Sequence, residues 1–152
     1  MPKLLLFAPC QKAIIDEVDK SVSLVGVMHG FNFQAIGEPP SATLPTNVVI
    51  PMNWAMVSIW LRLPEDNDKT FEQLIELITP DNTKVQASTQ AFQMTTRTHQ
   101  IAMSANTFPV GKTGEYKLVL SLREIEQTPW VQILEYPIVV HYLENQVQKA
   151  GN

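Results

Sequence analysis

Short segments in which apolar and polar residues alternate run along most of this chain. In residues 115–123 the apolar side chains fall at every second position, where a β-strand places them on one face: Tyr116, Leu118, Leu120 and Leu122. The sequence has no long segment of helical periodicity and no internal repeat, so the alternation of strands and helices that builds a parallel sheet is missing. The pattern therefore predicts an all-β fold.

Eight or nine strands are predicted, joined by short turns. The clearest of them cover residues 12–16, 22–29, 52–63, 71–79, 84–94, 97–104, 115–123 and 130–143. Such a series over 152 residues, with a turn roughly every 8–12 residues, is typical of antiparallel sandwiches and barrels. We expect a two-sheet sandwich. Residues 1–144 are predicted to form this single domain, and residues 145–152 a polar C-terminal tail.

Two connections indicate which strands are neighbours. The polar run Glu17-Val18-Asp19-Lys20 predicts a hairpin turn between segments 12–16 and 22–29. Segment 71–79 fits both helical and strand periodicity, but Thr79-Pro80-Asp81-Asn82 follows it, and proline presets φ for a tight turn. We therefore predict a strand at 71–79, paired in a hairpin with 84–94.

The first ten residues resemble a signal sequence only superficially. Residues 4–8 supply five apolar residues, fewer than the roughly 7–15 of a secretory segment, and Pro9 directly precedes Cys10. A single cysteine and the lack of any glycosylation sequon give no sign of an oxidising compartment. No apolar stretch approaches the roughly 18 residues of a membrane span. We expect a cytoplasmic protein with no membrane partner.

Charges are few and unevenly placed. The net charge is −4 and the 11 basic residues are scattered, which argues against nucleic acid as a partner. Residues 21–61 contain only Glu38, and residues 85–111 contain only Arg97. Two interpretations are open. These blocks form central strands, or they present a neutral outer face that contacts a protein partner or a second copy through aromatic residues such as Phe31, Phe33 and Trp54.

The tripeptide Gly111-Lys112-Thr113 resembles the end of a phosphate-binding loop. Asn106 stands where that motif requires its first glycine, and Pro109 lacks a backbone N–H. The segment also precedes a predicted strand, whereas a phosphate-binding loop precedes a helix. We predict a glycine turn here and no nucleotide site.

Catalytic motifs are missing from the sequence. Lys12 would lie on the same side of an extended chain as Cys10, but Pro9 and the apolar neighbours favour a buried, inert thiol. The nucleophile motif Gly-x-Ser-x-Gly does not occur, and the acidic pairs at 16–17 and 65–66 lie in predicted turns. The sequence therefore predicts no catalytic residue and no cofactor.

Three histidines carry the main alternative function. His29, His99 and His141 are isolated from one another in the sequence, so we assign no metal ligand. A sandwich fold can nevertheless bring distant histidines together, and two histidines with a carboxylate suffice to bind iron or zinc. The alternative is therefore a small metal-dependent enzyme or metal-binding protein.

Two segments resemble known proteins. Gly114-Glu115-Tyr116, which opens a strand, and the final strand through residues 135–140 resemble the last two strands of immunoglobulin-like domains, and Tyr116 resembles their corner tyrosine. Over nearly its full length, including residues 3–10, 14–16 and 51–54, the chain also resembles a family of small bacterial proteins of unknown function. The resemblance implies an immunoglobulin-like sandwich and assigns no activity.

The favoured function is a non-catalytic binding or structural module. Loops 31–47 and 105–114 are the predicted contact segments, because loops on a rigid scaffold often carry recognition. The predicted contact residues are Phe31, Phe33, Trp54 and Lys112. A further alternative is a subunit of a phage-like assembly.

Overall fold

The computed structural model describes residues 1–33, 48–125 and 129–143. The predicted tail at 145–152 lies outside these residues, as does most of the predicted contact loop 31–47. Within the described ranges, no helix has the length and apolar character that crossing a membrane requires.

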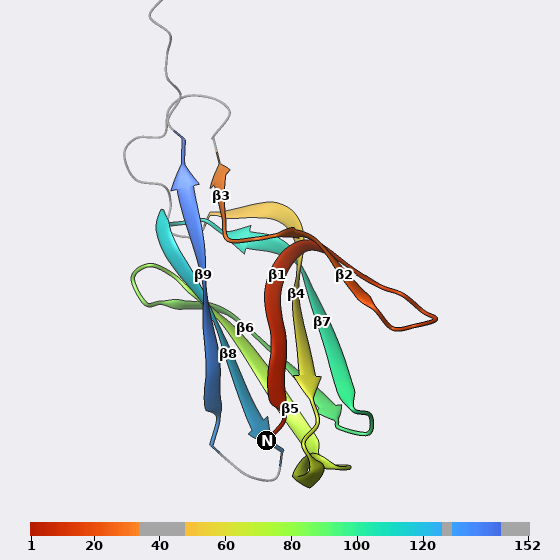
Figure 1. Ribbon diagram of the computed structural model, residues 1–152. Helices are drawn as coiled ribbons and strands as arrows, with labels where there is room; N and C mark the ends of the chain where they lie inside the picture. Colours follow the sequence, from red (N-terminus) through yellow and green to blue (C-terminus); the bar gives the residue numbers. More distant parts are fainter. Residues whose placement is uncertain (34–47, 126–128, 144–152) are drawn as a thin grey trace, which may run out of the picture.

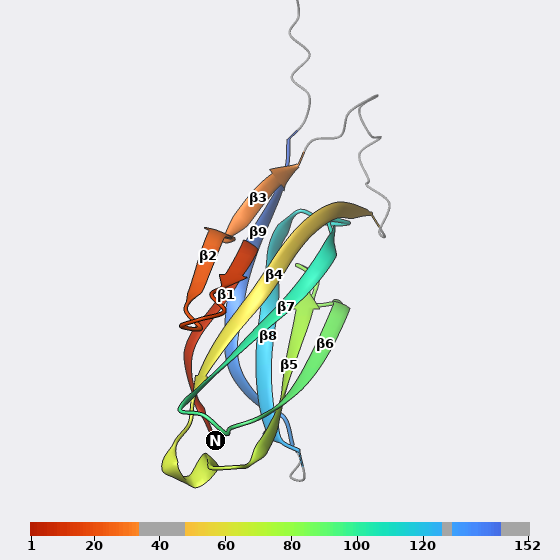
Figure 2. The same ribbon diagram turned by 90° about the vertical axis from the view of Figure 1, so that its right-hand side faces the viewer.

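The described residues form nine strands in two sheets that pack face to face (Figures 1 and 2), which confirms the predicted all-β sandwich. The first sheet has the order β2-β1-β4-β7, and the second has the order β3-β9-β8-β5-β6. A short 3-10 helix, η1 (Pro64–Asp66), precedes β5. The strands are β1 (Lys3–Ile15), β2 (Val22–Val27), β3 (Gly30–Phe33), β4 (Val49–Leu61), β5 (Thr70–Ile78), β6 (Lys84–Gln93), β7 (Thr98–Pro109), β8 (Gly114–Glu124) and β9 (Val131–Tyr142).

The strand order is that of an immunoglobulin-like sandwich. Immunoglobulin strands A, B and E share one sheet and C, F and G the other, and here β1-β4-β7 and β5-β8-β9 occupy those places. One pairing departs from the predicted antiparallel arrangement, because β3 runs parallel to β9 from Gly30↔Val139 to Phe33↔Tyr142. The reason is a crossing between sheets. After β2 the chain leaves the first sheet at Met28 and His29, and β3 joins the second sheet beside β9, on the same side of the sandwich as β2 (Figure 2).

The ambiguous segment 71–79 is a strand. It forms most of β5, which pairs with β6 in an antiparallel hairpin, as predicted. Asn82 adopts φ of 61° in the turn, a left-handed conformation that asparagine tolerates better than most residues. The turn is closed by Thr79, whose Oγ1 accepts the Thr83 backbone N–H at 3.0 Å.

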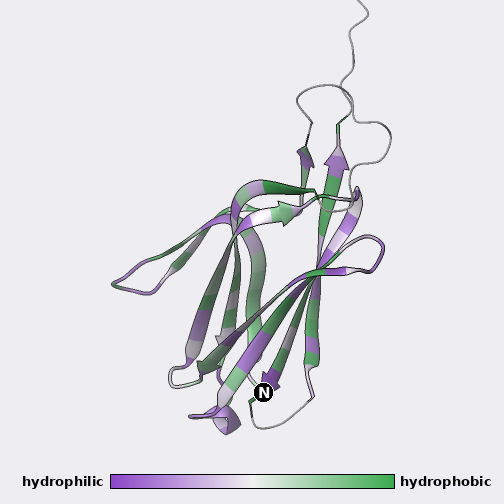
Figure 3. Ribbon diagram, turned by 180° about the vertical axis from the view of Figure 1, so that it is seen from behind, coloured by the Kyte–Doolittle hydropathy of each residue, from purple (hydrophilic) through white to green (hydrophobic). Residues whose placement is uncertain are grey.

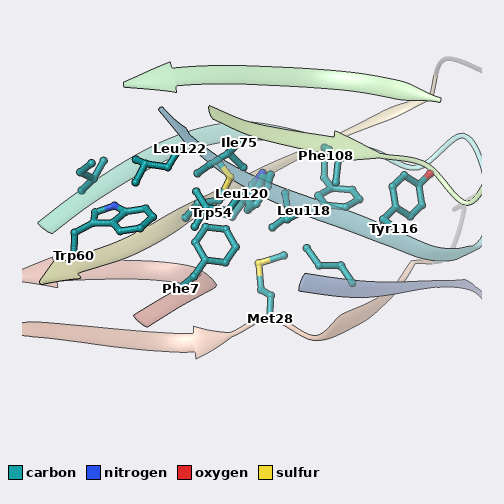
Figure 4. Close-up of a cluster of buried hydrophobic side chains, with 14 of the residues drawn as sticks. Phe7, Met28, Trp54, Trp60, Ile75, Phe108, Tyr116, Leu118, Leu120 and Leu122 are labelled. Carbon is teal, nitrogen blue, oxygen red and sulfur yellow. The ribbon is translucent and has the colours of Figure 1, made fainter. Parts of the chain in front are cut away.

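Strand β4 is buried on both faces, as predicted for a central strand. Its inner side chains, Trp54, Met56 and Trp60, belong to the main core between the sheets. Figure 4 shows Trp54 and Trp60 within this core. On the outer face Ala55 and Val57 pack against Cys10 in a second, smaller cluster. The protein therefore has apolar packing on the outside of its first sheet as well as between the sheets.

A buried polar network joins the two sheets. Gln73 on β5 is fully buried, and its Oε1 accepts hydrogen bonds from Ser58 Oγ at 2.7 Å and from Trp60 Nε1 at 3.1 Å, both on β4. Buried polar groups are normally paired in this way, because an unpaired group loses its hydration without compensation. One amide thus satisfies two donors from the opposite sheet.

Tyr116 forms the corner that the resemblance to immunoglobulin-like domains predicts. Its hydroxyl donates to the Lys112 carbonyl at 2.9 Å and accepts the Lys112 backbone N–H at 3.3 Å. Burial raises the pKa of Tyr116, so the hydroxyl keeps its proton and remains a donor. The turn from β7 to β8, which contains Gly111-Lys112-Thr113, is therefore held to the core.

Replacing Tyr116 with phenylalanine lowers the free energy of unfolding by about 1–2 kcal/mol, because the Lys112 carbonyl and amide lose a partner. Urea denaturation measures the difference. Tyr136→Phe is the matched control, since the half-buried Tyr136 ring packs on Phe7 and we expect only about 0.5 kcal/mol or less. Equal losses in the two variants would contradict the corner interpretation.

Candidate functional site

The hairpin of β1 and β2 projects from the sandwich as an arm, defined here as residues 11–27 (Figures 1 and 2). In its turn, Asp16 Oδ1 accepts the backbone N–H groups of Val18 and Asp19 at 2.7 and 3.0 Å, and these bonds lower the pKa of Asp16. Near the tip, Gln100 Nε2 on β7 donates to the Lys20 carbonyl at 2.6 Å. The arm therefore leans over the outer face of the first sheet and is attached at both ends.

The arm exposes an unusual amount of apolar surface for its size, and Figure 3 shows hydrophobic segments along it. Val18 at the tip is 94% exposed. Four more large apolar side chains of the arm are more than two-fifths exposed, namely Ile14, Ile15, Val25 and Val27. Apolar side chains gathered on a projecting element are typical of an interaction site, whereas scattered ones are ordinary.

A groove of about 550 Å³ lies between the arm and the outer face of the first sheet. Its lining residues on the arm are Gln11, Lys12 and Ala13, and those on β4 and β7 are Asn53, Trp54, Ala55, Ala102, Ser104, Ala105 and Asn106. Lys12 is the only charged residue among them, and it makes no ion pair within the described residues. The groove is therefore neutral except for one available ammonium group.

The groove is hollow because small side chains form its floor. The pairing of β4 with β7 places Ala55 opposite Ser104 and Val57 opposite Ala102. Between Pro51 and Trp54 the register of this pair shifts, which marks an irregularity in β4. Such irregularities twist a strand locally, and this one lies at the end of the groove.

Cys10 lies beside the groove but contributes no reactive group to it. The side chain is fully buried in the outer cluster with Ala55 and Val57, as predicted. Burial raises the pKa of the Cys10 thiol. The thiolate needed by a nucleophile or a metal ligand is thus disfavoured.

The predicted contact aromatics pack inward. Trp54 is 2% exposed and its indole N–H donates to the Thr107 carbonyl at 2.9 Å. Phe31 and Trp54 meet through Phe108, with ring centroids 4.9 and 5.5 Å from its ring. Phe33 lies against Tyr142 at the end of β9. The structure brings Phe31 and Trp54 together as core residues, and only Trp54 also borders the groove.

Lys112 lies at the corner held by Tyr116. Its ammonium pairs with the Asp81 carboxylate, which also accepts a hydrogen bond from the Thr79 hydroxyl. The Lys112 bond and then the Thr79 bond lower the pKa of Asp81 to about 2. The ammonium is thus engaged within the chain, and Gly111-Lys112-Thr113 forms a turn before β8, as predicted.

His99 lies apart from the other two histidines, which are both near one edge of the second sheet. His99 on β7 is half-buried and stacks on Phe92 with centroids 4.9 Å apart, and desolvation lowers its pKa. His29 and His141 are exposed near the pairing of β3 with β9. In the part of the chain that the structure describes, no three His, Cys, Asp or Glu side chains gather as metal ligands. The described residues therefore offer no geometry that supports the alternative of a metal-binding protein.

The two uncharged sequence blocks supply the edges of both sheets. Residues 85–111 contain nearly all of β6 and the whole of β7, and residues 21–61 contain β2 and β3. Among the strands that the structure describes, all four are terminal in their sheets. The interpretation of these blocks as central strands is therefore wrong except for β4. The distribution of charges along the sequence does not reveal the order of strands in a sheet, and that order decides which strands are central.

Sequence reasoning missed most of the groove. Its predictions used the aromatic residues, whereas the groove is lined by small and amide side chains, among them Asn53, Ser104 and Asn106. The available signal was the neutrality of residues 21–61 and 85–111. The lack of charge identified the segments that line the groove, but it did not show that they meet on the outer face of the first sheet.

Fold and groove together define an immunoglobulin-like β-sandwich with a projecting arm. Comparisons with models of protein families and with curated proteins found no match. The resemblance to a bacterial family of unknown function therefore stays a prediction.

Proposed function

We propose that this chain is a non-catalytic protein-binding module that holds a segment of a partner in the groove beneath its arm. The observation that carries the proposal is the neutral groove bordered by an arm whose tip residue, Val18, is 94% exposed. Cores of protein interfaces are depleted in charge, and their energy comes largely from a few apolar anchors. The arm supplies apolar anchors and the groove supplies uncharged amides.

The chemistry of the groove favours a particular kind of segment. Asn53, Ser104 and Asn106 offer hydrogen bonds to a main chain, and Lys12 offers one ammonium to a carboxylate. The segment that fits is extended and largely uncharged, with one acidic group and apolar side chains against the arm. Within this proposal the protein acts in the bacterial cytoplasm, where a lone buried thiol such as Cys10 stays reduced.

Site-specific photocrosslinking in the native organism tests the proposal. A photoreactive residue placed at Val18 and, separately, at Asn53 is expected to capture the same protein, because Asn53 lines the groove and Val18 is the exposed tip of the arm that borders it. The control position is Thr89, which is exposed on β6 in the other sheet. Capture of one protein from all three positions, or of none from Val18 and Asn53, would refute the groove as the binding site.

Charge reversal at Lys12 tests the polar part of recognition. Lys12→Glu is expected to weaken binding of the captured partner several-fold, since an acidic group then faces a carboxylate. Lys3→Glu is the matched control, because Lys3 is exposed at the opposite end of the same strand. Titration calorimetry with the purified partner measures both. Equal affinities for the two variants would exclude a role for the Lys12 ammonium.

A further inference from the structure

The terminal strands of the two sheets are nearly free of charge. Together β2, β3, β6 and β7 carry one charged side chain, Lys84 at the start of β6. The interior strand β8 alone carries four, Glu115, Lys117, Arg123 and Glu124. Proteins usually place charges, bulges or very short strands at sheet edges, because an edge offers unpaired N–H and C=O groups to other chains. This distribution is the reverse of the usual one.

Three of the four edges have another protecting device. Strand β3 has four residues. In β2, Gly26 adopts φ of 63° against the Gln11 side chain, which interrupts the extended edge. The register of β6 shifts near Lys84, and that residue pairs with Glu76. Each of these features hinders the addition of another strand.

Strand β7 has none of these devices. It is 12 residues long, has no charged side chain and contains proline only at its last position, Pro109. One of its edges pairs with β4 along the whole strand, from Thr98 to Pro109. In the described residues no strand covers the other edge. A long, regular, uncharged edge is a template for strand pairing.

The side chains of β7 suit pairing with an identical strand. In a twofold antiparallel pair each segment lies opposite its own copy, so any charged residue near the centre would face a like charge. The centre of β7 instead has small, exposed residues on its outer face, Ala102, Ser104 and Asn106, and half-buried Met103 and Ala105 on its inner face. A second copy would cover the exposed parts of Met103 and Ala105 and would meet no repulsion.

We propose that two copies of this chain associate through antiparallel pairing of β7 with β7 of the second copy about a twofold axis. The two four-stranded sheets then form one continuous eight-stranded sheet. This inference concerns a sheet edge and does not rest on the partner proposed for the groove. Its experiments use the purified chain alone, so the two proposals fail independently.

Size-exclusion chromatography with light scattering tests the association at tens of micromolar. Light scattering is expected to give a molar mass of twice the 17.1 kDa of one chain. The double variant Ala102→Lys/Ser104→Lys is expected to elute as a monomer, and so is Ala102→Glu/Ser104→Glu, because each places like charges across the twofold axis. An equimolar mixture of the two is expected to restore the dimer. That restoration separates repulsion at the edge from misfolding.

The matched control is Ala87→Lys/Thr89→Lys, which places the same charges at exposed positions on the β6 edge. It is expected to remain dimeric. A wild-type monomer would overturn the proposal, and it is also the result expected if β7 pairs instead with a strand of a different protein. Three other results would also overturn the proposal. They are a dimer that persists in both β7 variants, a mixture of the two variants that stays monomeric, and a control that dissociates as much as the β7 variants do.

Discussion

Replacing Gln73 with leucine lowers the free energy of unfolding by about 3 kcal/mol, because two buried donors then lose their only acceptor. Ser58 and Trp60 donate to the same Gln73 oxygen from the opposite sheet, and all three side chains are fully buried. Leucine fills a similar volume, so the loss comes from the unpaired groups and not from a cavity. Urea denaturation followed by tryptophan fluorescence gives the difference.

Two further variants test this explanation. Gln90→Leu on β6 is the control, since Gln90 is exposed and bonds only to the neighbouring Ala91 carbonyl, and a change of about 0.5 kcal/mol or less is expected. In the triple variant Gln73→Leu/Ser58→Ala/Trp60→Phe the donors are removed together with the acceptor. It should be more stable than the sum of its parts. Strict additivity would show that Gln73 acts through packing alone.

Truncating Phe108 to alanine costs about 4 kcal/mol, within the range typical of a fully buried phenylalanine. The Phe108 ring contacts Phe31, Trp54 and Tyr116, whose centroids lie 4.9, 5.5 and 5.5 Å away. These residues come from β3, β4 and β8, so one side chain on β7 connects both sheets. Thermal unfolding measures the loss. Hydrogen exchange is expected to show reduced protection in β3, which has four residues.

Phe33→Ala is the matched control for this cluster. Phe33 lies in the same strand as Phe31 but is half-buried at the margin of the core, and its ring lies against one other aromatic ring, that of Tyr142. Its truncation removes less contact, and we expect a cost of less than about 2 kcal/mol. If the two substitutions cost the same, Phe108 is not the residue that connects the sheets at this end.

Local patterns in the sequence contain most of the fold. Alternation and turn residues identify the strands, and the proline in Thr79-Pro80-Asp81-Asn82 correctly decides that 71–79 is extended. Burial of β4 on both faces follows from apolar residues at consecutive positions, such as Ala55 and Met56. The corner formed by Tyr116 is expected only from the resemblance to immunoglobulin-like domains, and it too joins residues only four apart. Each of these features is set within one strand or turn.

What the sequence does not reveal depends on contacts between distant segments. Gln73 interrupts the apolar face of β5, and only the opposite sheet shows that its amide satisfies two donors. Trp54 belongs to an uncharged block and resembles an exposed anchor until its indole N–H is seen bonded to Thr107. The projecting arm was not predicted for the same reason, because it too depends on contacts between distant segments. A hairpin at 12–29 is predictable, but its projection from the sandwich depends on the sheet beneath it.

The parallel pairing of β3 with β9 has a consequence for synthesis on the ribosome. Gly30 cannot find its partner, Val139, until the ninth strand has left the exit tunnel, although β3 is among the first segments made. Pairing of segments so far apart in sequence is slow, because a long loop must close first. During translation the residues of β3, Phe31 and Phe33 among them, stay without their strand partner. The last strand to emerge therefore sets the time at which the second sheet is completed.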